Sequence, residues 1–204
     1  ATGECFTVGI DSSFEGVIVP IPNGVPATAE VVSGTYYLEG LACESSTNCV
    51  AVGQSPSREA EAVTVPINDG VIGIVQAVPG ASDLYGVTCE GTTTCIAVGQ
   101  GFSGAVVVAI TDGVPGKLQS LPGTNSLWGV SCLDNADTCL AAGLNTSPSL
   151  QGDLLPIDNG SAGTIQTVSG TYEFMGVDCS STTTCVVVGE GTSGQGVVMT
   201  TPSG

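Results

Sequence analysis

The chain has 204 residues and a formal net charge of −17, with 19 acidic side chains, two basic ones and no histidine. Such a chain repels the phosphates of nucleic acid and the surface of anionic membranes, so we expect it to bind neither. Apolar residues make up 42% of the chain, but they form no run of 18 or more that could insert into a membrane.

A Val-Gly dipeptide, or Ala-Gly in one case, recurs along the chain at a nearly constant step. The distances between successive glycines are 44, 46, 44 and 46 residues, for Gly9, Gly53, Gly99, Gly143 and Gly189. A fixed period of this length is typical of a repeat architecture.

The chain begins inside a repeat, at the strand that carries Gly9 (called strand b here). Strand c follows at 16–21, and an Asn23-Gly24 turn leads to strand d. A Ser-Gly or Pro-Gly pair then marks the passage to the next repeat, which opens with a strand a ending in a cysteine. In the third repeat the predicted strands a to d are 84–89, 95–99, 105–110 and 117–121. Asn-Gly and Asp-Gly turns between strand segments predict tight hairpins, because both turn positions favour positive φ.

Four short antiparallel strands in about 45 residues are typical of a β-propeller blade. The sequence therefore predicts an all-β fold, a β-propeller of five blades within a single repeat domain. The first and last blades are incomplete or share strands, and we expect the chain ends to meet and close the ring. The alternative is that the chain is a fragment of a larger ring. Counted from the first cysteine of each pair, the repeat units are approximately 1–42, 43–88, 89–131, 132–178 and 179–204.

Eight of the nine cysteines form local pairs that flank a short polar loop between strands a and b. These are Cys43/Cys49, Cys89/Cys95, Cys132/Cys139 and Cys179/Cys185. Opposed positions of a hairpin bring Cβ atoms to the separation that a disulfide needs. Zinc binding is the alternative, but the spacing is wide and histidine is absent. We favour four disulfides, which indicates an oxidising compartment outside the cytosol.

Cys5 is left over, and its position before Gly9 makes it the second member of a pair. Its partner would lie before Ala1. The chain is then a piece of a longer precursor, which we favour, or Cys5 is free, or it bonds another chain.

One position of strand a varies between repeats while its neighbours stay constant. It is the position directly before a glycine, and it is occupied by Glu39, Tyr85, Trp128 and Met175. Near the start of the innermost strand of each blade, these residues would surround one mouth of the channel and form a ligand-binding site, with Tyr85 and Trp128 stacking on a sugar or a peptide. The more common alternative is that the aromatic residues fill the gap between blades.

Catalysis has little support in this sequence. There is no histidine and no Gly-x-Ser-x-Gly motif, and no acidic pair departs from the repeat in a site-like cluster. We predict no enzyme activity, no cofactor and no metal.

The phrases Leu84-Tyr-Gly-Val-Thr-Cys89 and Thr94-Cys-Ile-Ala-Val-Gly99 resemble the cysteine-containing, propeller-like repeats of secreted bacterial proteins, notably of actinobacteria. The resemblance covers the whole chain as repeats. It implies a propeller and export, and it implies no particular activity.

Two functional hypotheses follow. The first is a secreted or cell-surface propeller that binds a glycan or an extracellular protein without chemistry, as an adhesion module. The second is a structural subunit of an extracellular assembly or filament, joined to its neighbours through edge strands and Cys5.

Overall fold

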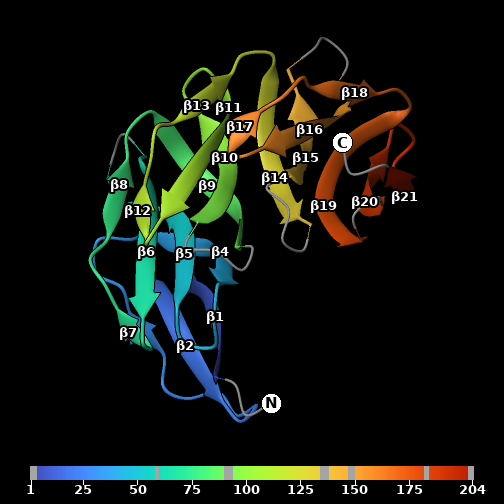
Figure 1. The fold of residues 1–204 in the computed structure, drawn as a ribbon. Coiled ribbons are helices and arrows are strands. Elements are labelled where there is room, and N and C mark those ends of the chain that lie inside the picture. The colour runs from blue at the N-terminus through green and yellow to red at the C-terminus, as the bar shows by residue number, and fades with distance from the viewer. Residues whose placement is uncertain are drawn as a thin grey trace.

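The computed structural model describes residues 4–57, 60–89, 94–133, 138–146, 150–181 and 184–201. Within these ranges the chain is all-β, and its strands form five antiparallel sheets. Each sheet is one blade, and the blades follow one another along an arc (Figure 1). None of the described segments is a helix long and apolar enough to span a membrane.

The first and last blades have three strands each, and the three between them have five. Blade 1 consists of β1 (Glu4–Ile10), β2 (Gly16–Pro22) and β3 (Glu30–Val31). Blade 2 consists of β4 (Tyr37–Cys43), β5 (Cys49–Gln54), β6 (Ala62–Asn68), β7 (Val71–Ile72) and β8 (Gln76–Val78). Blade 3 consists of β9 (Ala81–Cys89), β10 (Thr94–Gly101), β11 (Gly104–Thr111), β12 (Val114–Pro115) and β13 (Gln119–Leu121). Blade 4 consists of β14 (Thr124–Cys132), β15 (Thr138–Asn145), β16 (Gly152–Asp158), β17 (Ser161–Ala162) and β18 (Gln166–Val168). Blade 5 consists of β19 (Thr171–Ser181), β20 (Thr184–Gly191) and β21 (Gly196–Thr201).

The predicted strands a, b and c are single strands, whereas strand d is split. In blade 3 it forms β12 and β13, which pair with opposite ends of β11. The turn before it has positive φ at both central residues, 51° at Asp112 and 77° at Gly113, as the Asp-Gly pair predicts. The Asn-Gly or Asp-Gly turns of blades 1, 2 and 4 share this conformation.

Four apolar clusters hold the blades together, one at each junction between neighbours. At the junction of blades 3 and 4, for example, Ile96, Val98 and Val107 pack with Leu155 and Ile157. The β-branched and small residues that fill these clusters suit two sheets packed face to face. The core is therefore a series of equivalent layers along the arc.

All four predicted disulfides are present, so these sulfur atoms are bonded to each other and are not free thiolates that could bind zinc. They link Cys43 to Cys49, Cys89 to Cys95, Cys132 to Cys139 and Cys179 to Cys185. In each case the two cysteines are directly opposed on strands a and b. Cys5 is exposed and unpaired within the chain.

The prediction that the chain ends come together is wrong. Blade 1 and blade 5 lie at the two ends of an open arc (Figure 1). Among the described strands, β1 pairs only with β2, and β21 pairs only with β20. The terminal blades are thus incomplete, as predicted, but they share no strand.

Candidate functional site

The inner wall of the arc is formed by strand a of blades 2 to 5, which are β4, β9, β14 and β19. Each lies at the inner edge of its sheet, and the strands a of neighbouring blades contact each other (Figure 1). Glycines make this approach possible. A Cβ atom on Gly86 would lie 2.9 Å from the carbonyl oxygen of Trp128, and one on Gly129 would lie 3.2 Å from the Cα of Gly176. Since only glycine lacks that atom, backbones of neighbouring blades can touch here.

Immediately before each of these glycines lies a β-bulge in strand a. In blade 3 the pairing passes from Gly86 opposite Val98 to Leu84 opposite Gly99, and Tyr85 is left without an opposite residue. The same step omits one residue in each of the other three blades, namely Glu39, Trp128 and Met175. We call these four residues the bulge row. A bulge turns its extra residue away from the regular alternation of the strand, so these side chains are set apart from the core.

The bulge also explains the repeated Val-Gly motif. A Cβ atom on Gly99 would lie 2.1 Å from the carbonyl oxygen of Asp83, and the equivalent distances at Gly53, Gly143 and Gly189 are 2.2, 2.0 and 2.0 Å. Strand a bends so closely over strand b at the bulge that no side chain fits beneath it. The bulge therefore requires the glycine of the Val-Gly motif, and this requirement explains why the motif recurs in each repeat.

The four members of the bulge row differ in their exposure. Glu39, Trp128 and Met175 are exposed, and Tyr85 is half-buried. The rings of Tyr85 and Trp128 stack with their centroids 4.5 Å apart and an interplanar angle of 26°. This contact joins blades 3 and 4, as the gap-filling interpretation predicts for the aromatic pair. Trp128 nevertheless retains 36% of its surface, which leaves an aromatic area open to a ligand.

Behind the row lies a polar cluster that the sequence did not reveal. Asp83 is almost fully buried, and its Oδ2 accepts hydrogen bonds from the hydroxyl of Tyr37 and from Nε2 of Gln54. Gln54 also donates to the carbonyl oxygen of Ser82, at 3.2 Å. The other carboxylate oxygen, Oδ1, is buried without a hydrogen-bond partner among the described residues. The cluster ties blade 2 to blade 3 in the neighbourhood of Glu39.

A second set of hydrogen bonds holds Tyr85 in place. Its hydroxyl donates to Oε1 of Gln100 at 3.2 Å, and Nε2 of Gln100 donates to Oδ1 of Asn125 at 3.1 Å. The backbone carbonyl of Gln100 accepts from Ser82 at 3.0 Å. A ring fixed at both its face and its hydroxyl loses little entropy when it binds, which favours a preformed binding surface.

Burial and negative charge raise the pKa of several groups in this region. Burial raises the pKa of Asp83 to about 6, although hydrogen bonds from Tyr37 and the Leu84 backbone oppose the shift. Burial and the nearby Asp83 also raise the pKa of Glu39. Burial, with the charges of Asp83 and Glu39, raises the pKa of Tyr85 to about 12. The surface around the row is thus acidic at neutral pH, with its carboxylates held at a cost in stability.

That cost predicts a pH dependence of stability. Because the pKa of Asp83 is raised in the folded protein, the folded state binds this proton more tightly than the unfolded state. The stabilisation that proton binding at Asp83 gives to the folded state is fully present below the unfolded pKa, and it is lost as the pH rises from about 4 to about 6. We expect Asp83→Asn to increase the free energy of unfolding at pH 7 by on the order of 2 kcal/mol. We also expect the free energy of unfolding of this variant to fall less than that of the wild type between about pH 4 and about pH 6.

Urea unfolding at both pH values measures this effect. Asp69→Asn is the matched control, because Asp69 is exposed in a turn where blades 1 and 4 have Asn23 and Asn159. An equal pH dependence in the wild type and in Asp83→Asn would contradict the prediction.

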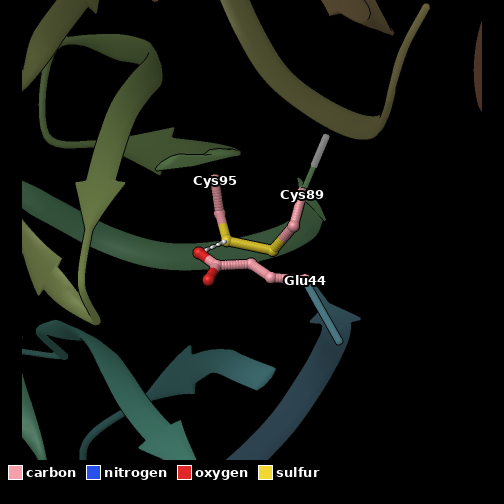
Figure 2. Close-up of side chains that lie close together, drawn as sticks. All are labelled: Glu44, Cys89 and Cys95. Carbon is pink, nitrogen blue, oxygen red and sulfur yellow. Dashed lines mark hydrogen bonds between the residues drawn. A yellow bond between two sulfur atoms is a disulfide. The ribbon is translucent and has the colours of Figure 1, made fainter. Parts of the chain in front are cut away.

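Glu44, Cys89 and Cys95 form the one group of potential metal ligands found among the described residues, and their ligand atoms lie within 4.8 Å of one another. Figure 2 shows that the two sulfurs are bonded to each other, with the Glu44 carboxylate beside Cys95 at 3.5 Å. Disulfide sulfurs are not thiolates, so they do not offer metal ligation. They also carry no hydrogen, so this contact is a hydrogen bond only when Glu44 is protonated. Burial and the nearby Asp112 raise the pKa of Glu44, which favours that form.

Comparison with known proteins identifies a fold and no family. No family model matches the sequence, and neither does any curated protein. Among solved structures, the chain is similar to the WD40 repeats of RRP9, with a TM-score of 0.55 and 7% identity over 96% of this chain and 56% of that one. It is also similar to the β-propeller domain of the trilobed protease from Pyrococcus furiosus, with a TM-score of 0.56 and 8% identity over 96% of this chain and 64% of that one.

These similarities establish the predicted β-propeller-like fold. At 7% and 8% identity they say nothing about activity. The chain also spans less than two thirds of the length of either structure. The trilobed protease domain is described as having an open velcro topology.

Proposed function

We propose that this chain is a non-catalytic binding module of an extracellular protein, and that the bulge row is its ligand-binding surface. The observation that carries the proposal is the coincidence of two patterns. One strand a position varies in chemistry between repeats while its two neighbours stay constant, and a β-bulge removes this same position from the regular pairing in all four blades that have a strand a. Bulges that re-aim side chains are over-represented beside functional sites.

The chemistry of the row supports a glycan, or a protein segment, as the ligand. Trp128 supplies an exposed aromatic face, backed by Tyr85, on which a sugar ring or an apolar side chain can stack. Glu39 supplies a carboxylate that can accept hydrogen bonds from hydroxyl or amide groups. Met175, with 63% of its surface exposed, supplies an adaptable apolar contact at the end of the row.

The four disulfides support an extracellular location for such a module. They recur in every blade that has both strands a and b, and disulfides persist in oxidising environments. The resemblance of the repeats to those of secreted bacterial proteins agrees with this location.

Binding to a glycan array, and to isolated extracellular matrix and cell-surface proteins, tests the proposal. For a ligand found in this way, we expect Trp128→Ala to weaken binding at least about 10-fold, because central aromatic residues dominate binding energy. Phe102→Ala is the matched control, since Phe102 is an exposed aromatic residue with 69% of its surface accessible and lies outside the bulge row. Saturable binding that is equally strong in both variants would contradict the proposed surface.

A further inference from the structure

The two ends of the arc expose the faces that inner blades use to pack on one another. Inner blades have a rear face toward the preceding blade and a front face toward the following one. In blade 3 the front face carries Ile96, Val98 and Val107, which are 6%, 0% and 0% exposed and pack on blade 4. Its rear face carries Cys95, Val106 and Val108, which pack on blade 2.

The front face of blade 5 has the same pattern, but within the described chain no blade covers it. Val186, Val188 and Val198 occupy the positions of Ile96, Val98 and Val107, as the register of β20 with β21 shows. They are 40%, 43% and 72% exposed. Their neighbours on the opposite face of the same strands, Cys185 and Val187, are buried against blade 4.

The rear face of blade 1 is the complementary surface. Val17, Val19 and Ile21 of β2 occupy the positions of Val106, Val108 and Ile110. Val17 is buried, and Val19 and Ile21 are half-buried, whereas their three equivalents in blade 3 are completely buried. The opposite face of β1 and β2 packs on blade 2 through Phe6, Val8 and Ile18.

Cys5 lies on the same rear face, directly opposite Ile21. It occupies the position of the strand b cysteine, which is at most 3% exposed in each of the other four blades. In blade 1 it is exposed. The thiol therefore marks a surface that a neighbouring blade covers everywhere else in the molecule.

From this equivalence we infer that two copies of the chain associate head to tail, with the front face of blade 5 of one copy packed on the rear face of blade 1 of the next. The occupant that fits the front face best is a rear face of this repeat type, because four such junctions already hold the arc together. The contact is heterologous, so it closes a ring if the rotation permits and otherwise continues as a filament. A net charge of −17 on each copy opposes association, so the junction strengthens with salt.

Sedimentation velocity over a concentration series, at physiological and at high salt, tests the inference. A Cys5→Ser background excludes intermolecular disulfides as the cause of association. We expect the mass to rise with concentration, and we expect either Val198→Glu on the front face or Val19→Glu on the rear face to abolish the rise. Val114→Glu is the matched control, because Val114 is exposed on blade 3 and lies outside both faces.

A mixture of the two face variants gives the sharpest readout. Each retains one intact face, so an equimolar mixture should form a capped dimer that neither variant forms alone. With Cys5 present, its alkylation rate should also fall at least about 10-fold between dilute and concentrated protein. A monomer at every concentration with a constant alkylation rate overturns the inference. Association that survives both face variants also overturns it, in favour of pairing through edge strands.

Discussion

Replacing Gly99 by alanine is expected to lower the free energy of unfolding by about 3 kcal/mol or more. The new Cβ atom would lie 2.1 Å from the carbonyl oxygen of Asp83 and 2.8 Å from the Cα of Leu84. Both are backbone atoms, so no side-chain rotation relieves the overlap. Strand a must move away from strand b, and this movement breaks the bulge and the packing of the buried Leu84. Chemical denaturation of the purified protein measures the change.

Gly9→Ala is an internal control for this prediction. Gly9 occupies the same place in the repeated motif, but no atom lies within 4 Å of a Cβ built on it, because blade 1 has no strand a among its described strands. We expect this variant to stay within about 0.5 kcal/mol of the wild type. Equal destabilisation by the two substitutions would show that the motif glycine has a role unrelated to the bulge.

Reduction of the four disulfides is expected to remove most of the stability of the fold. Each disulfide joins cysteines six or seven residues apart, and closing a loop of that size contributes about 2 kcal/mol in the chain-entropy description. Four such loops contribute about 8 kcal/mol, which is comparable with the whole stability of an ordinary domain. Thermal unfolding followed by circular dichroism, with and without a phosphine reductant, measures the loss.

A single bridge tests the same reasoning at smaller scale. The double variant Cys89→Ser, Cys95→Ser is expected to lose about 2 kcal/mol, and somewhat more if the serine hydroxyl placed at the buried position of Cys95 finds no partner. Cys5→Ser, measured at low concentration, is the control and should be unchanged, because Cys5 is exposed and forms no bridge in the chain. A reduced protein that unfolds at the same temperature as the oxidised one would contradict the prediction.

The repeat made most of the fold predictable. The step between Val-Gly motifs, the cysteine pairs and the Asp-Gly turns are local signals, and they proved to be strands, disulfides and tight turns with positive φ at the expected places. The open arc was not predictable, because the local pattern of each blade is the same in a closed and in an open array. Whether the array closes depends on the angle between successive blades, which arises from how side chains such as Ile96 and Leu155 interlock.

The candidate site was predictable only in part. Variation against the repeat background identified Glu39, Tyr85, Trp128 and Met175, and their position before a glycine is where the bulges lie. The polar cluster around Asp83 was missed, because Tyr37 and Asp83 are equivalent positions of two successive repeats that carry unlike side chains, and only the packing of blade 2 on blade 3 brings them together with Gln54. One signal was present, since Asp83 takes a place where the neighbouring repeats have Tyr37, Ser126 and Glu173.

At the four bulge positions, the side chain can differ while the hydrogen-bonded framework of the blade stays the same. A residue with no opposite partner contributes little to the hydrogen-bonded ladder, so it can be exchanged without redesigning the blade. The glutamate, tyrosine, tryptophan and methionine found there are already four unlike side chains at equivalent positions of one framework. Randomising the codons of the three exposed members, Glu39, Trp128 and Met175, should therefore yield a library in which most members fold, and new affinities could be selected from this scaffold directly.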